Sequence, residues 1–463
     1  MSIFSFLKKN NMNNLIQVLL WLPRLGVGGL FIFSGLIKAN DPLGFSYKLE
    51  EYFEEFAKIF TEHGLGFLAA PMEWIAYIAL PMAMFIVVLE IVLGVLTILG
   101  VQMKKVSIWL FVLILFFTFL TFVSWKYDLV KTCGCFGDFW VLTPFESFLK
   151  DLILIVGIIP LFIYRNSVES LLSPIGGELT IWVSGIVFFL FTFYCFRHLP
   201  VADHRAYAVG DSLFENMKVV PGNPLVLYKL KNKHTGVVAE LADFPDDYKN
   251  WAQYIDPNDS SAAFYREVDQ ELDIKYIEIK STGQKTMVEE VPEEYKNDWI
   301  VYKDSTITFF PSKDPKIMDL VAESLESGED KLQELLSDSI YRFMLIVRDL
   351  NFYGTFENTN DGVVFMKSTK GEKNYAAVKK LFVESAAKGY EYNILTTEID
   401  NQKIQAFKHE MNTRVDFYSS NDIELKTMIR SSPGLILFKK DTVVGKWHYN
   451  DFPIFEEITN DYK

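Results

Sequence analysis

The segment Lys131-Thr132-Cys133-Gly134-Cys135-Phe136-Gly137-Asp138, which we call the cysteine loop, contains two of the three cysteines in this chain of 463 residues. It lies between two long apolar runs, Val106–Val123 and Phe148–Tyr164. Three more apolar runs occur within the first 200 residues: Asn13–Ile37, Ile75–Gly100 and Ile181–Phe196. A helix needs about 20 residues, with a range of about 17–25, to cross the hydrocarbon core of a bilayer. The pattern therefore predicts five membrane spans, with the cysteine loop between the third and the fourth.

The first apolar run is expected to stay in the protein as a span. It is longer than the apolar region of a typical signal peptide, it carries Arg24, and no small-x-small cleavage pattern follows it. The alternative is a soluble protein with buried apolar helices. Five such runs in succession favour a membrane protein over this alternative.

Basic residues in short loops predict the orientation of the spans, because cytoplasmic loops carry an excess of Lys and Arg. These residues are Lys8, Lys9, Lys104, Lys105 and Arg165. The N-terminus is therefore expected in the cytoplasm of a bacterium, with the spans in its inner membrane. The cysteine loop and everything after Arg197 are expected in the periplasm, where a disulfide can persist.

Charge divides the chain into two halves. Residues 1–200 contain 13 basic and 14 acidic residues, and the remainder carries a net charge of −13. An acidic half without a basic patch argues against nucleic acid as a partner, because binding to phosphate rests largely on Lys and Arg. We therefore expect membrane lipid and another protein as partners. Three cysteines also exclude a framework of several disulfides.

Two charged residues interrupt the apolar runs, Arg24 in the first and Glu90 near the middle of the second. A charge at the centre of a bilayer costs about 2.5–3.5 kcal/mol on insertion scales, so such groups usually face the bundle and pair. We expect Arg24 and Glu90 to meet inside the bundle. Their role is either structural, as an ion pair or a neutral Glu90 with a polar partner, or functional, as a proton or quinone site.

The membrane half resembles the DoxX-like family. The resemblance rests on Arg24-Leu25-Gly26, on Phe33-Ser34-Gly35-Leu36-Ile37-Lys38, on Asp41-Pro42 and on Leu89-Glu90 with Leu93-Gly94. The segment Cys133-Gly134-Cys135-Phe136-Gly137-Asp138, followed by Lys150-Asp151-Leu152, resembles the methylamine-utilisation MauE branch. The resemblance covers about residues 14–165 and implies a four-helix unit within residues 1–170. The fifth span, within residues 171–200, lies outside this pattern and is expected to carry the chain outward. It also implies a polar site in the bundle formed by Arg24, Lys38, Glu90 and Asp138, and support for disulfide formation in an exported enzyme.

Two cysteines one residue apart can close a small, strained disulfide, and strain makes a disulfide easier to reduce. Lys131 is placed to favour a thiolate nearby. A zinc site needs four ligands, and this loop contains no histidine, so we expect no metal. Cys133 and Cys135 are thus either a catalytic redox pair or idle thiols in a structural loop. Cys195 is either a buried apolar thiol or a third member of the relay.

Residues 201–210 are polar and rich in turns, as in a linker, and residues 211–335 read as an α+β subdomain outside the membrane. Within it, Leu225–Leu230 and Gly236–Leu241 predict a hairpin. Ile274–Ile279 and Ser305–Phe310 predict further strands, and Met318–Leu336 has the spacing of a helix.

Residues 336–463 begin with Phe343–Val347, a continuous apolar run typical of a strand buried on both faces. The elements expected after it are a helix at Asn374–Lys388, a strand at Glu391–Thr396, a helix at Asp400–Met411, a strand at Val415–Tyr418, a helix at Ile423–Ile429, and the two strands Gly434–Phe438 and Thr442–Trp447. This order resembles the thioredoxin fold, with Pro433 at the position of the cis-proline of that family. The resemblance implies a peptide-binding edge at Ser432 and Pro433.

The active-site Cys-x-x-Cys of thioredoxins is missing, because Arg348-Asp349-Leu350-Asn351 follows the first strand and no cysteine occurs after Cys195. This α/β domain cannot exchange disulfides itself. Either it holds an extended peptide, or it is a spacer or assembly domain.

Two functions from different classes follow. The first is an inner-membrane protein that supports thiol redox, folding or maturation of exported proteins, with a quinone as a cofactor that the bundle would suit. The second is a non-catalytic docking subunit of an envelope export or assembly complex, and a transporter is a third, weaker reading. The sequence carries no phosphate-binding loop, His-Glu-x-x-His motif or nucleophile elbow. Whether the protein is an enzyme stays open at this stage.

Overall fold

A computed structural model describes residues 3–127, 129–130, 134–218, 223–232, 238–242, 263–268, 274–279, 284–287, 299–310, 315–360 and 362–461; side chains at 3–17, 135, 219–314 and 459–461 lie outside the description. The chain forms two compact units. The first combines Met1–Leu213 with Asp319–Lys463, and the second is Phe214–Met318.

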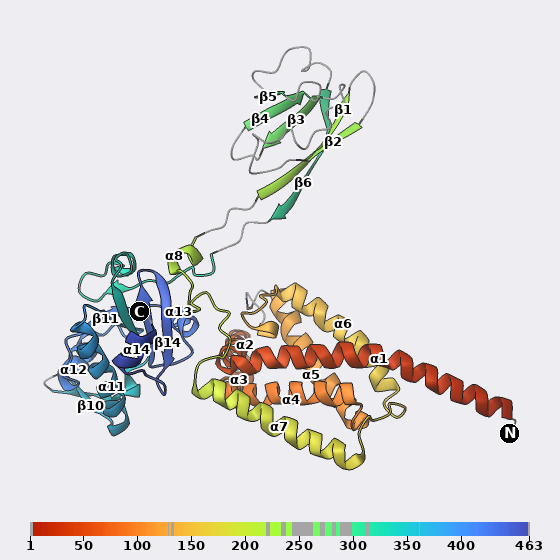
Figure 1. Cartoon of the computed structure of the whole chain (residues 1–463), viewed down its shortest axis with the longest axis horizontal. Coiled ribbons are helices and arrows are strands. Elements are labelled where there is room, and N and C mark those ends of the chain that lie inside the picture. Colours follow the sequence, from red (N-terminus) through yellow and green to blue (C-terminus); the bar gives the residue numbers. More distant parts are fainter. Residues whose placement is uncertain are drawn as a thin grey trace. The chain divides into compact units, whose positions relative to one another are not determined.

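Helices make up the membrane half of the first unit. They are α1 (Ile3–Asn40), α2 (Pro42–Glu62), α3 (Gly66–Tyr77), α4 (Ala79–Leu99), α5 (Met103–Tyr127), α6 (Pro144–Ile163) and α7 (Pro174–Arg197), with the short 3-10 turn η1 (Gly134–Phe136) before α6. The helix pairs α1–α4, α5–α6, α1–α6 and α4–α7 pack against one another (Figure 1). We call this group of helices the bundle.

Among the described residues, four helices are long and apolar enough to cross a membrane: Val18–Asn40 within α1, and the whole of α4, α5 and α7. The remaining expected span corresponds to α6, which has 20 residues and is therefore about 30 Å long. Its first half carries three charged residues, Glu146, Lys150 and Asp151, within six positions of the chain. It nevertheless packs beside α5 and α1 as part of the bundle.

The segment between α1 and α4 is helical, which the sequence pattern did not predict. Asp41 begins α2 as its N-cap, because its side chain accepts a hydrogen bond from the Gly44 N–H and Pro42 follows at the first helical position. Buried residues of α2, such as Leu49 and Tyr52, face the bundle, where α2 packs on α3 and α4. This amphipathic helix therefore covers one end of the bundle beside the C-terminal end of α1.

Close contact between α1 and α4 depends on two glycines. A Cβ added at Gly94 would lie 2.7 Å from the carbonyl oxygen of Gly28, and one added at Gly28 would lie 2.8 Å from that of Gly94. Both distances are shorter than a van der Waals contact, so the backbones approach as small residues allow in membrane helices. The register of α1 against α4 is fixed at this crossing.

The C-terminal part of the first unit is an α/β domain built on one sheet of six strands, in the order β14-β13-β8-β11-β12-β7. The strands are β7 (Glu323–Ser324), β8 (Tyr341–Val347), β11 (Glu391–Thr396), β12 (Asp416–Ser419), β13 (Gly434–Lys439) and β14 (Thr442–His448). Strands β8, β11 and β12 are parallel, whereas β13 runs antiparallel to β8. Strand β8 is buried on both faces, which confirms the prediction from its apolar run.

Helices complete this domain: α10 (Leu332–Leu335), α11 (Thr369–Ala386), α12 (Asn401–Glu410), α13 (Asp422–Met428) and α14 (Phe455–Asp461). The 3-10 turn η4 (Leu350–Phe352) and the hairpin of β9 (Gly354–Thr359) and β10 (Gly362–Lys367) lie between β8 and α11. The sequence pattern missed this hairpin.

The helix predicted over Met318–Leu336 is wrong. This stretch contains only the two-residue β7 and the four-residue α10. Gly328 between them adopts a φ of 69°, and Asp330 accepts hydrogen bonds from the N–H groups of Ala322 and Leu332. The apolar spacing instead reflects residues such as Leu320 and Leu335, which are buried against the α/β domain.

The second unit, Phe214–Met318, contains two three-stranded sheets with the orders β2-β1-β6 and β3-β4-β5. Its strands are β1 (Asn223–Asn232), β2 (Val238–Ala242), β3 (Ala263–Val268), β4 (Ile274–Ile279), β5 (Gln284–Met287) and β6 (Trp299–Phe310), and the short helix α8 (Leu213–Asn216) leads into it. Strands β1 and β2 are antiparallel neighbours, as the predicted hairpin requires. Residues 233–237, where its turn was predicted, lie outside the described residues.

The glycine crossing yields the first prediction. Replacing Gly94 with Leu should separate α1 from α4, because the new side chain meets the backbone of Gly28. Replacing Gly29 with Leu is the matched control, since a Cβ at Gly29 meets no atom within 4 Å. We expect the Gly94 variant alone to lose several degrees of apparent melting temperature in detergent. Equal losses in both variants would contradict the assigned crossing.

Candidate functional site at the junction of the bundle and the α/β domain

Lys38 and Glu90 form a buried ion pair between α1 and α4. The Lys38 ammonium lies 2.8 Å and 3.0 Å from the two carboxylate oxygens of Glu90, and the two side chains are only 3% and 5% exposed. Lys38 also donates to the Ser34 hydroxyl at 2.8 Å and lies over the ring of Phe117 at 4.6 Å. Every donor direction of the ammonium therefore meets an oxygen or an aromatic face.

The expected pairing of Arg24 with Glu90 is wrong. Arg24 donates to the carbonyl oxygens of Thr97 and Ile98 at the end of α4, and its guanidinium lies over the ring of Trp21. The reason is the antiparallel register of the two helices. Arg24 precedes Lys38 by almost four turns, which is about 21 Å along the helix axis. It therefore lies opposite the last turn of α4, whereas Glu90 lies opposite Lys38.

A second ion pair, between Lys150 and Asp151 of α6, lies close to the first. The two groups are 2.6 Å apart, Asp151 is fully buried, and the Thr121 hydroxyl of α5 donates to it at 3.0 Å. A cavity of about 10 Å³ is lined by Lys38, Glu90, Lys150 and Asp151 together. A buried water needs about 10–15 Å³, so this cavity has room for about one.

The described part of the cysteine loop caps this polar region. In η1, the buried ring of Phe136 contacts Phe33 of α1 and stacks on Trp140, and the Lys150 ammonium lies 5.6 Å from it. Gly137 follows with a φ of 51°, in the left-handed region that favours glycine. Lys131, Thr132, Cys133 and the side chain of Cys135 lie outside the described residues, so the expected roles of the two cysteines and of Lys131 stay predictions.

Arg430 of the α/β domain reaches the bundle. Its guanidinium donates to both carboxylate oxygens of Asp41 at 2.9 Å and 3.0 Å and lies 3.5 Å from Asp138, the last residue of the cysteine loop. Burial alone would raise the pKa of Asp41, but Arg430 and then Arg205 lower it overall. Burial would likewise lower the pKa of Arg430, and Asp41 and Asp138 raise it instead. Asp41 and Arg430 therefore form a charged pair.

Tyr47 of α2 fills the space beside this contact. Its ring faces three cations of the α/β domain: Lys426 at 5.0 Å, Arg430 at 5.5 Å and Arg348 at 5.7 Å. Arg348 also donates to the Tyr47 hydroxyl at 3.2 Å. An aromatic ring attracts cations through its negative face, so Tyr47 acts as an anchor between the two parts.

Residues 201–210, expected as a linker, are held in place by the same junction. Asn40 at the end of α1 exchanges two hydrogen bonds with the backbone of Ala202. Asp203 pairs with Arg205 and with Lys446 of β14, at 2.7 Å each. Burial, followed by the charge of Arg205, lowers the pKa of Lys446 to about 7, although Asp203 opposes this.

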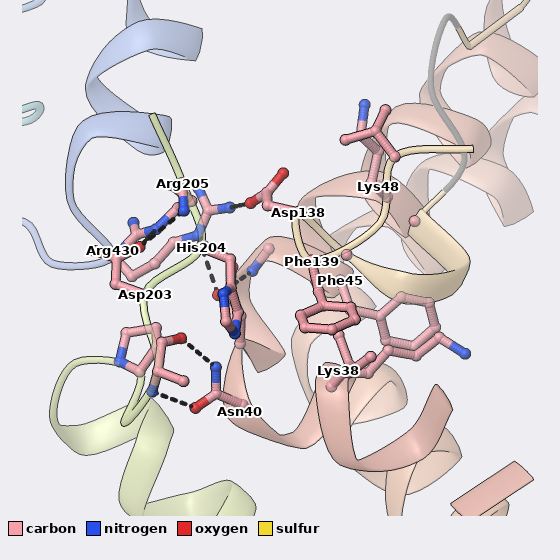
Figure 2. A pocket seen from close by; sticks show the side chains of 18 residues that line it. Lys38, Asn40, Phe45, Lys48, Asp138, Phe139, Asp203, His204, Arg205 and Arg430 are labelled. Carbon is pink, nitrogen blue, oxygen red and sulfur yellow. Dashed lines mark hydrogen bonds and ion pairs between the residues drawn. The ribbon is translucent and has the colours of Figure 1, made fainter. Parts of the chain in front are cut away.

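These elements enclose a cavity of about 160 Å³. Figure 2 shows it between the end of α1, the cysteine loop, residues 203–205 and Arg430 of the α/β domain. The exposed His204 ring meets Phe139 edge to face, with centroids 5.0 Å apart. The lining is Ile37, Lys38, Asn40, Asp41, Gly44, Phe45, Lys48, Gly134, Gly137, Asp138, Phe139, Val141, Pro200, Ala202, Asp203, His204, Arg205 and Arg430.

The remaining predicted site residues, Ser432, Pro433 and Cys195, do not line this cavity. Pro433, three residues after Arg430, is buried, and its peptide bond with Ser432 is cis. The Ser432 hydroxyl accepts a hydrogen bond from the Arg348 N–H at 3.1 Å. Cys195 near the end of α7 is a free, buried thiol. No group of side chains suited to a metal ion occurs among the described residues.

Of the predicted site residues, the structure pairs Lys38 with Glu90. It also places Asp138 beside Arg430, just before Pro433 in the chain. Arg24 lies apart from these residues, at the end of α4. Sequence reasoning missed Asp41, Tyr47 and Arg430 as partners. Asp41 was visible only as part of the Asp41-Pro42 motif. Arg430 carried no signal, since its partner lies 389 residues earlier in the chain.

Comparison with known proteins gives one family. Residues 16–164 match the family model described as methylamine utilisation protein MauE. This segment covers α1 from its fourth turn to the end of α6, including the cysteine loop, and the α/β domain lies outside it. The match and the four apolar helices indicate a membrane protein. No curated protein and no solved structure matches the chain.

The buried pair Lys38–Glu90 yields a second prediction. Replacing either residue alone with Met leaves a buried charge without its partner, which typically costs about 3–5 kcal/mol. Replacing both should cost clearly less than the sum of the single changes. The measurement is a double-mutant cycle of apparent stability in detergent, with the exposed pair Lys380–Glu384 as control. Additive effects at Lys38 and Glu90 would show that the two do not interact.

The contact of Arg430 with Asp41 yields a third prediction. Replacing Asp41 with Asn keeps an oxygen to cap α2 but removes the charge that faces Arg430. We expect faster hydrogen exchange at residues 426–432, because this segment loses the ion pair between Arg430 and Asp41 that attaches it to the bundle. Asp400→Asn is the matched control, since Asp400 caps α12 within the α/β domain by accepting hydrogen bonds from the N–H groups of Gln402 and Lys403. Equal exchange in both variants would contradict the proposal that the ion pair with Asp41 attaches this segment to the bundle.

The same contact predicts a pH dependence. The pKa of Asp41 in the folded protein lies below its ordinary value of 3.8, so its contribution to stability is complete above about pH 4 and disappears as the pH falls further. Protection of residues 426–432 should therefore hold from pH 7 to about pH 4 in the native protein. Loss of protection already near pH 6 would point to another group.

Proposed function

We propose that this protein is an inner-membrane accessory protein that supports thiol–disulfide exchange, and thereby folding or maturation, in exported proteins. Cys133 and Cys135 are the exchanging pair in this proposal. The observation that carries it is the ion pair of Arg430 with Asp41 and Asp138. It joins Asp138, at the end of the cysteine loop, to the segment next to Ser432 and Pro433, so the α/β domain is held beside the loop that carries the two cysteines.

The chemistry follows from the spacing of the cysteines. A Cys133–Cys135 disulfide would be attacked by a thiolate of the client protein, and a second client thiol would then resolve the mixed disulfide. The client gains a disulfide, and the pair is left as two thiols. A quinone of the membrane is the class of acceptor we propose for reoxidation: it takes up two electrons and two protons and becomes a quinol, while the disulfide of the pair forms again.

The α/β domain contributes binding and not electron transfer, because it contains no cysteine. Its sheet order, with β13 beside β8 and β11 on the other side, agrees with the proposed thioredoxin-like fold. Ser432 and Pro433 form the proposed peptide-binding edge. Client proteins of this domain are extended polypeptides that reach the outer face of the membrane.

Orientation is part of the proposal. The N-terminus lies in the cytoplasm of a bacterium, and the cysteine loop and the α/β domain lie in the periplasm. This arrangement requires α6 to cross the membrane together with the other four long helices. The buried pairing of Lys150 with Asp151, supported by Thr121, removes much of the cost of carrying charge in that helix.

A non-catalytic docking subunit of an envelope complex is the second candidate. Burial of Pro433 favours it, because a peptide-binding edge needs to be open. In this reading the bundle anchors the α/β domain, and the cysteines are idle.

The fifth prediction separates the two candidates. The double variant Cys133→Ser, Cys135→Ser should leave a client of the envelope with unpaired thiols, which trapping with a maleimide followed by mass spectrometry detects. Cys195→Ser is the matched control and should keep the client oxidised. If the pair stays reduced in the native envelope and the double variant behaves as the native protein, the redox function is wrong and the docking role stands.

A further inference from the structure

The short helix α3 exposes a row of large aromatic side chains on one face. Phe67, Trp74 and Tyr77 are 74%, 63% and 87% exposed. With about 3.6 residues per turn, these three positions fall within one quarter of the helix circumference. Ala69 and Ala76, which are buried, lie on the opposite face. The inner face of α3 therefore packs on the protein, while its outer face presents three aromatic rings to the surroundings.

The neighbouring helix α2 has a different outer face. Helix α3 packs against α2, whose exposed side chains include the charged Glu54 and Lys58. In α3, by contrast, Glu73 is the one charged residue among 12, and it lies beside the aromatic row and not within it. Two helices in contact thus suit different surroundings: the outer face of α2 suits water, and that of α3 suits an apolar medium.

The length and position of α3 place it at the boundary of the membrane. A helix of 12 residues is about 18 Å long, whereas the hydrocarbon core is about 30 Å thick, so α3 cannot cross it. Ile78 joins α3 directly to α4, which is long and apolar enough to span. Figure 1 shows α3 at the end of the bundle opposite the N-terminus. Helix α3 therefore lies where a membrane span begins.

Aromatic residues of a second helix occur at the same end of the bundle. Helix α5 follows α4 in the chain and packs against it, so α5 ends at the level where α4 begins. Its last turn carries Trp125 and Tyr127, which are 44% and 67% exposed. Trp and Tyr are enriched at membrane–water interfaces, because each combines an apolar ring with a polar group. The outer row of α3 continues this band.

We infer that α3 lies in the plane of the membrane surface, with the face formed by Phe67, Trp74 and Tyr77 immersed between lipid headgroups and acyl chains. The partner of this face is the lipid bilayer. Continuity with the lipid-facing side of α4 selects this occupant, because Phe85 in the second turn of α4 is 66% exposed as well. The inference adds a lipid-binding surface to the protein and does not depend on the redox chemistry proposed above.

The lipid-binding surface also bears on the contact between the bundle and the α/β domain. Helix α2, which packs on α3, begins after Asp41 and carries Tyr47. Both residues contact Arg430 of the α/β domain. Immersion of α3 thereby holds Asp41 and Tyr47 near the level of the lipid headgroups, so the bilayer itself sets the depth at which the α/β domain rests.

The test is quenching of tryptophan emission by brominated lipid. The full-length protein is reconstituted in phosphatidylcholine vesicles with bromine atoms either near the top or near the end of the acyl chains. The difference between the native protein and Trp74→Phe gives the emission of Trp74. Because an interfacial helix buries its apolar face only about 5–10 Å, the shallow bromines should quench this emission about twofold more than the deep ones.

Trp447→Phe is the matched control, since Trp447 packs against the core of the α/β domain. Neither brominated lipid should quench the emission assigned to Trp447. Emission of Trp74 that neither lipid quenches would place this face in water or against a second copy of the chain, and overturns the inference. Stronger quenching by the deep bromines overturns it too, because the helix would then enter the hydrocarbon core.

Lipid cross-linking gives an independent readout on the unsubstituted protein. A phosphatidylcholine with a photoreactive group at the top of its acyl chain should label residues 65–77. It should leave the exposed side of α2 around Glu54 and Lys58 unlabelled. Equal labelling of the two helices, or label on α2 alone, would contradict the assigned surface.

Discussion

The pairing of Arg430 with Asp41 and Asp138 is the interaction on which the account of this protein depends. A buried guanidinium needs carboxylates nearby, because loss of one partner of a buried ion pair typically costs about 3–5 kcal/mol. Here the two carboxylates come from different elements, the start of α2 and the end of the cysteine loop. One side chain of the α/β domain thereby fixes two features of the bundle, and the ring of Tyr47 closes the gap beside them.

The position of Asp41 depends in turn on the interior of the bundle. Asp41 follows Lys38 by less than one turn, and Lys38 is held to α4 through Glu90 and to its own helix through Ser34. The close crossing of Gly28 and Gly94 sets the register that brings Lys38 opposite Glu90. A chain of contacts therefore runs from the membrane interior, through the end of α1, to the surface where Arg430 binds.

Much of the fold could be predicted from the sequence, but its pairings could not. The apolar runs gave the spans and the strand β8, because burial leaves a direct mark on composition. The partner of Glu90 was assigned wrongly, since a single sequence fixes which residues are buried but not the register between two helices. The contact of Arg430 with Asp41 left no mark at all, because it joins residues far apart in the chain. The prediction of a helix at Met318–Leu336 was wrong because the chain turns at Gly328 and at Asp330.

The central claim is that the α/β domain rests on the bundle beside the cysteine loop, on the same side of the membrane. The most direct measurement places a photo-cross-linking phenylalanine derivative at position 47 and irradiates intact membranes. The account predicts that the cross-linked peptides contain residues near Lys426, Arg430 or Arg348. Cross-links to lipid or other proteins alone, with none to the α/β domain, would contradict it.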